Sequence, residues 1–148
     1  MVSNIPPSRS VVVKSIPSAI DGLYEWILNI LEANGFSTKD IFAVHLALEE
    51  AFLNAIKHGN KMDSSKDVKI DCSVTPDRID IFMTDEGGGF GPNTVPDPRC
   101  SENLYKTGGR GLFLMRSYLD VVEFNERGNC VHMARYKRKR NIKSVKSR

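Results

Sequence analysis

The sequence predicts an α+β fold, a two-layer sandwich in which helices pack on one face of a mixed, mostly antiparallel β-sheet. The strand-like segments are short and alternate apolar with polar residues, whereas helical periodicity is confined to a few stretches. Strands and helices also occur in separate runs rather than in strict alternation, which is typical of α+β domains. A length of 148 residues suits one domain of ordinary size.

The first third of the chain predicts one strand and two helices. Residues 9–16 are rich in β-branched side chains and predict a short strand. A helix follows from Pro17, since proline is tolerated in a first helical turn, and Asn34-Gly35 ends it. Its apolar face repeats every three or four residues, through Leu23, Trp26, Ile27, Ile30 and Leu31.

A second helix begins at Ser37, where Asp40 is the acidic partner of a capping pair. We expect this helix to run to about His58 and to end at Gly59. Residues 67–75 and 78–84 then alternate in hydrophobicity on either side of a Pro-Asp turn, so they predict a hairpin.

Residues 85–111 form a long segment without periodicity. They hold seven glycines and three prolines, and loops of this length inside a compact domain are often active-site lids. After the segment we expect a short helix over 112–119 and two strands over 121–126 and 129–136.

The positive charge of the chain is concentrated at its C-terminal end. From Arg135 onward there are eight Lys or Arg and no acid, which predicts a solvated, disordered extension. Only Tyr136 is aromatic there, so no base-stacking platform is evident and nucleic-acid binding is disfavoured. We divide the chain into an N-terminal extension (1–8), one folded domain (9–136) and a basic tail (137–148).

Composition also bears on the compartment of the protein. No long uncharged apolar run predicts a membrane-spanning helix, and no apolar h-region predicts a signal peptide, so we expect a cytoplasmic protein. Cys72, Cys100 and Cys130 are far apart and odd in number, which favours neither a disulfide framework nor a zinc site. We expect Cys72 and Cys130 to be small buried hydrophobes.

One side of the second helix carries polar side chains at four-residue spacing. The stripe consists of Leu46, Glu50, Asn54 and His58. The amide oxygen of Asn54 suits Mg²⁺, which needs few protein ligands, and Glu50 could accept a proton one turn away. A solvated helix flank is the simpler alternative. Glu49 lies about 100° off the stripe and is expected to face solvent. His58 is either a ligand or base, or a cation favoured by the helix dipole.

Two glycine clusters flank the long segment. Asp85 follows a strand, and the glycines at 87 and 89 let the backbone approach a flat ligand closely. The Asp85 carboxylate could accept a hydrogen bond from an amine of that ligand. A plain turn would use the same pattern. The second cluster, at residues 107–111, opens a helix and predicts an anion site, with a flexible helix approach as the alternative. It matches neither the P-loop nor the Rossmann pattern.

Taken together, these motifs resemble those of the GHKL ATPase superfamily, whose domain has the Bergerat ATP-binding fold. Residues 50–59 resemble its N-box, residues 85–89 its first glycine box and residues 109–112 its second. Within the superfamily the chain is most similar to small bacterial anti-sigma factors that are also serine/threonine-protein kinases. The phrases at 54–61 and 109–116 carry that likeness.

The resemblance implies a role for each matching residue. Asn54 would bind Mg²⁺, Glu50 would be the general base, and Asp85 would bind the adenine amine of ATP. Gly87 and Gly89 would make room for the base. The backbone amides of Gly109 and Gly111 would bind the phosphates, and Lys106 and Arg110 would add positive charge from the lid. The remaining residues of this nucleotide-binding segment would be Thr107, Gly108 and Leu112.

The resemblance also implies an activity and partners. The chain would use Mg-ATP to phosphorylate an anti-sigma-factor antagonist, and it would sequester a sigma factor that the antagonist releases by partner switching. Members of the group are commonly homodimers. Two alternatives remain open: an ATP-sensing binding module without kinase activity, and a detached histidine-kinase-type catalytic domain.

Overall fold

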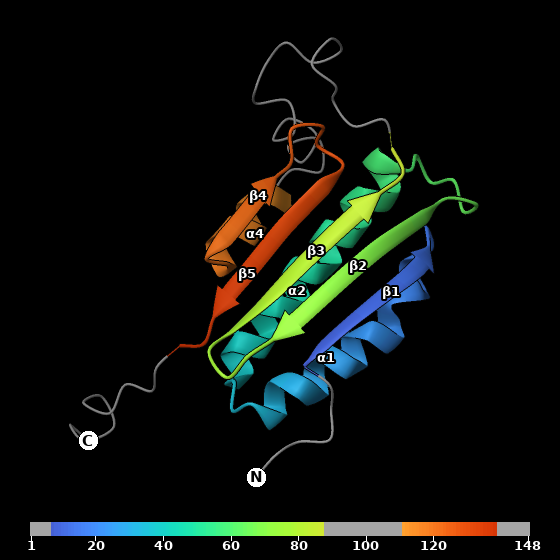
Figure 1. Cartoon of the computed structure of the whole chain (residues 1–148). Coiled ribbons are helices and arrows are strands. Elements are labelled where there is room, and N and C mark those ends of the chain that lie inside the picture. Colours follow the sequence, from blue (N-terminus) through green and yellow to red (C-terminus); the bar gives the residue numbers. More distant parts are fainter. Residues whose placement is uncertain (1–6, 88–110, 139–148) are drawn as a thin grey trace, which may run out of the picture.

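The structure is a computed structural model that describes residues 7–87 and 111–138. Within them, five strands form one sheet in the order β1-β2-β3-β5-β4, and the helices lie together on one of its faces (Figure 1). The strands are β1 (Ser8–Lys14), β2 (Asp67–Val74), β3 (Arg78–Asp85), β4 (Val121–Phe124) and β5 (Cys130–Tyr136). The predicted two-layer α+β sandwich is confirmed.

All neighbouring strand pairs in the described residues are antiparallel, so the mixed character that we expected is not seen there. The reason is the path between β1 and β2. Two helices separate these strands, so the chain crosses the sheet twice and returns to the end at which β1 finished. Lys14 therefore lies opposite Asp67 in the register, and their side chains form an ion pair of 3.0 Å.

The first helical segment starts and stops where the sequence predicts. It begins as a single 3-10 turn, η1 (Pro17–Ile20), and continues as α1 (Asp21–Ala33). Gly35 ends it in the left-handed conformation, with φ at +79°, which glycine adopts without steric penalty.

The second helix, α2 (Thr38–Asn54), has the predicted capping box. The Asp40 N–H donates to the Ser37 hydroxyl at 3.0 Å, and the Ser37 N–H donates to the Asp40 carboxylate at 3.2 Å. The helix then widens into a π-turn, η2 (Ala55–Gly59), so it ends at Gly59 as expected. Turns of this kind are rare in proteins, and those that occur are often found at functional sites.

The helical layer is completed by α4 (Gly111–Tyr118), which packs on α2 behind β4 and β5 (Figure 1). No helix of the described residues is long and apolar enough to cross a membrane.

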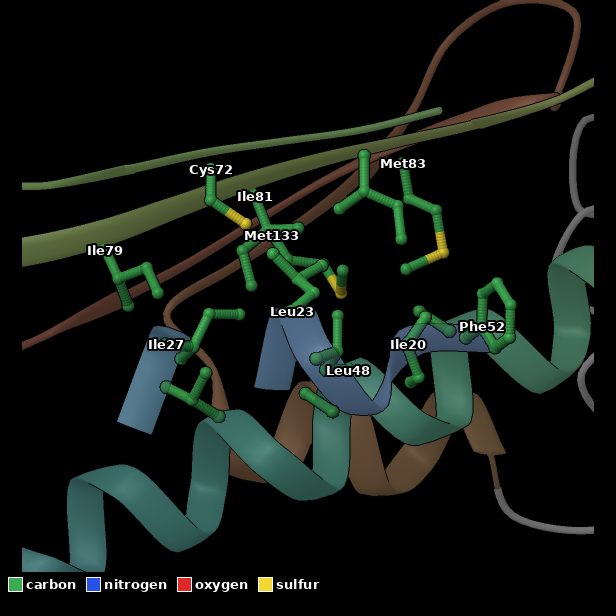
Figure 2. Close-up of a cluster of buried hydrophobic side chains, with 14 of the residues drawn as sticks. Ile20, Leu23, Ile27, Leu48, Phe52, Cys72, Ile79, Ile81, Met83 and Met133 are labelled. Atoms are coloured by element: carbon green, nitrogen blue, oxygen red, sulfur yellow. The ribbon is translucent and has the colours of Figure 1, made fainter. Parts of the chain in front are cut away.

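The hydrophobic core fills the space between the sheet and the helices. Figure 2 shows side chains of α1 and α2 directed toward side chains of the sheet, with Ile27 and Leu48 on the helical side and Ile79, Met83 and Met133 on the strands. All five are at most 2% exposed. Burying one such side chain contributes about 1.5–3 kcal/mol, so this layer accounts for most of the favourable free energy of folding.

The cysteines divide between the two faces of the sheet. Cys72 lies in the core as predicted, and burial raises the pKa of its thiol to about 12, which makes it unreactive. Cys130 is only half-buried, because its position on β5 points to the face that no described helix covers; there its sulfur accepts a hydrogen bond from Thr84 at 3.2 Å. Both are free thiols, and Cys100 lies outside the described residues.

Arg135 corrects the predicted tail. The basic run suggested a solvated side chain, but Arg135 is only 4% exposed and forms an ion pair with Asp40, which is fully buried. Its Nε donates to Asp40 Oδ1 at 2.9 Å, and its Nη1 donates to the carbonyl of Tyr118 at 2.6 Å. The guanidinium thus joins β5, the first turn of α2 and the last turn of α4.

The next two residues of the run also contact the folded domain. The Lys137 ammonium lies 5.2 Å from the centre of the Phe36 ring, and Arg138 pairs with Asp120 at 2.8 Å. A charge run in the sequence does not reveal these contacts, since each partner lies far away along the chain.

The buried pair leads to a first prediction. Arg135→Met leaves the Asp40 carboxylate buried without its cation, so it should lower the free energy of unfolding by about 3–5 kcal/mol. The matched control is Arg138→Met, which breaks a more exposed pair and should cost less than about 1 kcal/mol. Urea unfolding of both variants measures the difference, and equal losses would show that the buried pair has no special weight.

Candidate active site

The end of β3 meets the end of η2 through a close contact between Asp85 and Gly59. A Cβ atom on Gly59 would lie 2.2 Å from Asp85 Oδ2, and a Cβ atom on Gly87 would lie 2.3 Å from the Gly59 carbonyl oxygen. Neither position can carry a side chain unless its neighbours move. Glycines at 59 and 87 therefore let the carboxylate sit directly against the backbone of the helix end.

The Asp85 carboxylate is held in a poorly hydrated position. Burial raises its pKa to about 6, and this effect outweighs the opposing influence of the Gly87 N–H and the Lys66 charge. The Gly87 N–H donates to Oδ1 at 2.8 Å, whereas no described residue donates to Oδ2. The site thus offers one partly dehydrated acceptor oxygen, which suits a ligand amine.

The polar stripe of α2 is ordered by its own backbone. Glu50 and Asn54 are half-buried, and Asn54 Nδ2 donates to the Glu50 carbonyl at 2.9 Å. This bond fixes the orientation of the amide, so Oδ1 is the end that is available to a ligand. Glu49 is exposed as predicted and pairs with His45 at 3.4 Å.

The surroundings of His58 disfavour its protonated form. Burial lowers its pKa below the usual value, and the neighbouring charges of Lys57 and Lys61 lower it further. A favourable dipole interaction would raise the pKa instead. Burial and the neighbouring lysines thus favour the neutral form of His58, which can donate or accept a hydrogen bond.

The two halves of the site are close because one turn of helix connects them. Asn54 is the last residue of α2, and Gly59, which contacts Asp85, is the last residue of η2. The described residues contain no group of three His, Cys, Asp or Glu side chains that could hold a metal. A cation here would need oxygens from phosphate and water in addition to the Asn54 amide, which suits Mg²⁺.

The phosphate side of the predicted site is only partly described. Gly111 is the buried first residue of α4, and Leu112 is 8% exposed within the core, so the helix start packs against the domain. The other predicted positions lie outside the described residues: Gly89, Lys106, Thr107, Gly108, Gly109 and Arg110.

Asn60 is a functional candidate that we did not expect from the sequence. Its side chain is fully buried, although it directly follows the glycine that ends the helix. The available signal was a polar residue that follows a Gly at a helix end and precedes an exposed, charged loop. That signal does not predict burial, because the partners of Asn60 come from the residue after β1, the start of β2 and the residue after β3.

Comparisons with known proteins assign the domain to a class, a nucleotide-binding domain of ATPase type. The family profile of the histidine kinase-like ATPase domain matches residues 13–135, and the chain belongs to this family. Membership implies the use of ATP.

Individual relatives narrow the class. The serine-protein kinase RsbW of Bacillus subtilis is 32% identical in an alignment of 112 positions, and the match covers 69% of this chain and 68% of that protein. The serine-protein kinase RsbW of Staphylococcus aureus is 29% identical in an alignment of 118 positions, and the match covers 74% of each chain. The chain is therefore grouped with the serine-protein kinases of the family.

A solved structure supports the fold. The crystal structure of the RsbU and RsbW domains of Rv1364c from Mycobacterium tuberculosis superposes with a TM-score of 0.60 at 14% identity. The superposition covers 90% of this chain and 34% of that one, so the similarity concerns one part of a longer protein.

The second prediction follows from the buried carboxylate. The pKa of Asp85 is higher in the folded than in the unfolded protein, so its ionised form destabilises the fold at about pH 8, and this effect disappears below about pH 4. Asp85→Asn should therefore raise the thermal unfolding midpoint at about pH 8, and the gain should shrink as the pH falls through about 6.

A carboxylate on the same strand provides the control. Burial raises the pKa of Asp80, but hydrogen bonds from Arg78 and His132 outweigh this and lower it. Asp80→Asn should therefore lower the unfolding midpoint at about pH 8. Thermal melts over a pH series test both signs, and a midpoint that Asp85→Asn lowers at every pH would contradict the role assigned to burial.

Proposed function

We propose that the chain is a Mg-ATP-dependent serine/threonine-protein kinase. The observation that carries the proposal is the contact of Asp85 with Gly59 and Gly87. It lies one helical turn from the Asn54 amide on α2, and the Glu50 carboxylate lies one turn further along the same helix. One end of this site suits a purine amine, and the other end suits a cation with a proton acceptor beside it. The serine-protein kinases among the relatives supply the reaction class.

Each described residue has a role in this proposal. Asp85 Oδ2 accepts a hydrogen bond from the adenine amino group, and Gly87 lets the adenine ring approach the backbone. Asn54 Oδ1 holds Mg²⁺, which when bound neutralises phosphate charge. The substrate hydroxyl oxygen forms the new bond to the γ-phosphorus, the bond to the ADP oxygen breaks, and Glu50 takes the hydroxyl proton.

The remaining binding roles are assigned by the family motif. The backbone amides of Gly109 and Gly111 hold the phosphates at the start of α4, and Lys106 and Arg110 add positive charge from the lid. Phosphoryl transfer depends mainly on positioning and charge neutralisation, so few side chains are needed.

We further propose that the protein substrate is an anti-sigma-factor antagonist and that the kinase also sequesters a sigma factor. The likeness to anti-sigma-factor kinases and the similarity to RsbW proteins support these partners. Nucleotide state would bias which partner is held, since a ligand shifts an equilibrium by its differential affinity for two states. A homodimer located in the cytoplasm fits this partner switching.

The third prediction tests the nucleotide site. In calorimetric titrations, wild-type protein should bind ATP more tightly with Mg²⁺ than without it. Asn54→Ala should reduce the gain in ATP affinity that Mg²⁺ provides by about tenfold or more, because the variant lacks the amide oxygen that would bind the cation. The control is Asn29→Ala on α1, which should change neither value. Failure of the folded wild type to bind ATP would leave a nucleotide-independent binding domain as the better interpretation.

The fourth prediction tests the chemistry. With an anti-sigma-factor antagonist of the same organism as substrate, Glu50→Gln should lower the rate of phosphate transfer by about a hundredfold or more while ATP binding persists. Glu49→Gln is the matched control, because Glu49 is exposed and adjacent, and it should retain activity.

Acid treatment of the labelled product separates the alternatives. Phosphoserine or phosphothreonine survives acid, whereas phosphohistidine does not and would indicate a histidine-kinase-type reaction. Tight ATP binding without any transfer in the wild type would instead indicate an ATP-sensing module, and equal transfer by Glu50→Gln would remove Glu50 as the base.

A further inference from the structure

The buried amide of Asn60 connects four segments of the chain. Its Nδ2 donates to the Ser15 hydroxyl at 2.8 Å and to the Asp67 carbonyl at 3.0 Å, and its Oδ1 accepts the Glu86 N–H at 2.8 Å. Ser15 in turn donates to the Lys66 carbonyl at 2.8 Å. Both donors and the acceptor of the amide are therefore used, which compensates for burying it.

The contact with Glu86 fixes the backbone next to Asp85. A second contact holds the same residue, because the Asp67 N–H donates to Glu86 Oε2 at 2.5 Å. On the other side, the Asp85 N–H donates to the Asn129 carbonyl at 2.9 Å. The backbone is thus held by Asn60 at Glu86 and by Asn129 at Asp85, and the Glu86 side chain is tied to the first residue of β2. These bonds restrain the position from which the Asp85 side chain extends.

Asn60 also fixes the surface on which Asp85 rests. Its own N–H donates to the Ala55 carbonyl at 2.8 Å and closes the π-turn, which places the preceding Gly59. One residue therefore positions both partners of the contact, the carboxylate through its side chain and the glycine through its backbone. A role in stability alone would need only the Ser15 and Asp67 branch of the network.

We propose that Asn60 is a positioning residue that holds the Asp85 carboxylate against Gly59 and thereby sets the selectivity of the site for adenine over guanine. The proposal rests on the nucleotide-binding function proposed above. Adenine presents an amine where guanine presents a carbonyl oxygen. A fixed ionised carboxylate therefore accepts a hydrogen bond from the adenine amine and repels the guanine oxygen. A carboxylate that can turn away loses both effects.

The fifth prediction compares three variants by the ratio of Kd for GTP to Kd for ATP. Asn60→Ala should lower this ratio by about tenfold or more, because a loosened Asp85 binds ATP more weakly and tolerates GTP. Gly59→Ala is the positive control, since its Cβ atom displaces Asp85 directly. Ser15→Ala is the matched control: it breaks the other branch of the network and should lower stability without changing the ratio.

A measurement without nucleotide separates this proposal from the proposed function. Carboxyl NMR titration of the folded, unliganded proteins should find a raised Asp85 pKa in the wild type and in Ser15→Ala. In Asn60→Ala the value should move toward that of an exposed aspartate. If the wild type binds no ATP but this pattern holds, the function fails and the positioning role stands. An unchanged Asp85 pKa in Asn60→Ala overturns the positioning role.

A milder variant covers the case in which Asn60→Ala does not fold. Glu86→Ala removes only the contact with the Asp67 N–H, and its side chain is exposed, so the fold should persist. The proposal expects a smaller change in the same direction, in both the nucleotide ratio and the Asp85 pKa. Because the Glu86 N–H still donates to Asn60 in this variant, no change in either quantity would show that restraint of the Glu86 side chain does not set the position of Asp85, which counts against positioning through Glu86.

Discussion

The carboxylate of Asp85 lies against the backbone of Gly59, and this contact joins the end of a strand to the end of a helix. Because one turn of helix separates Gly59 from Asn54, the same contact sets how far the Asp85 carboxylate, the proposed acceptor of a ligand amine, lies from the Asn54 amide, the proposed Mg²⁺ ligand. The π-turn, the glycines and the buried amide of Asn60 all serve to hold this geometry.

This contact carries a thermodynamic penalty that the rest of the domain offsets. Partial burial of an ionised carboxylate destabilises the fold at neutral pH, and within the described residues only the Gly87 N–H donates to the Asp85 side chain. The core between the sheet and α1 and α2 supplies the compensating free energy. The buried Asp40–Arg135 pair holds the opposite end of α2, so the helix is anchored at both ends.

Local signals predicted most of the elements because the interactions that decide them are local. The capping box of Ser37 and Asp40, the left-handed Gly35 and the hairpin of β2 and β3 each depend on residues only a few positions apart. Glu49 was likewise assigned to solvent from helical spacing alone. The half-buried Cys130 and the buried Arg135 departed from expectation, because the covering helices decide which sheet positions are enclosed.

The sequence by itself determined the two-layer class, the boundaries of the helices, and the motif residues Glu50, Asn54, Asp85 and Gly87, since periodicity, capping and glycine spacing are written in neighbouring positions. Only the tertiary structure decided that Gly59 lies against Asp85 and that Asn60 links the end of β1, the start of β2 and the end of β3 through Ser15, Asp67 and Glu86. The physical reason is that desolvation and buried hydrogen bonds depend on which distant segments meet, and no local pattern encodes that meeting.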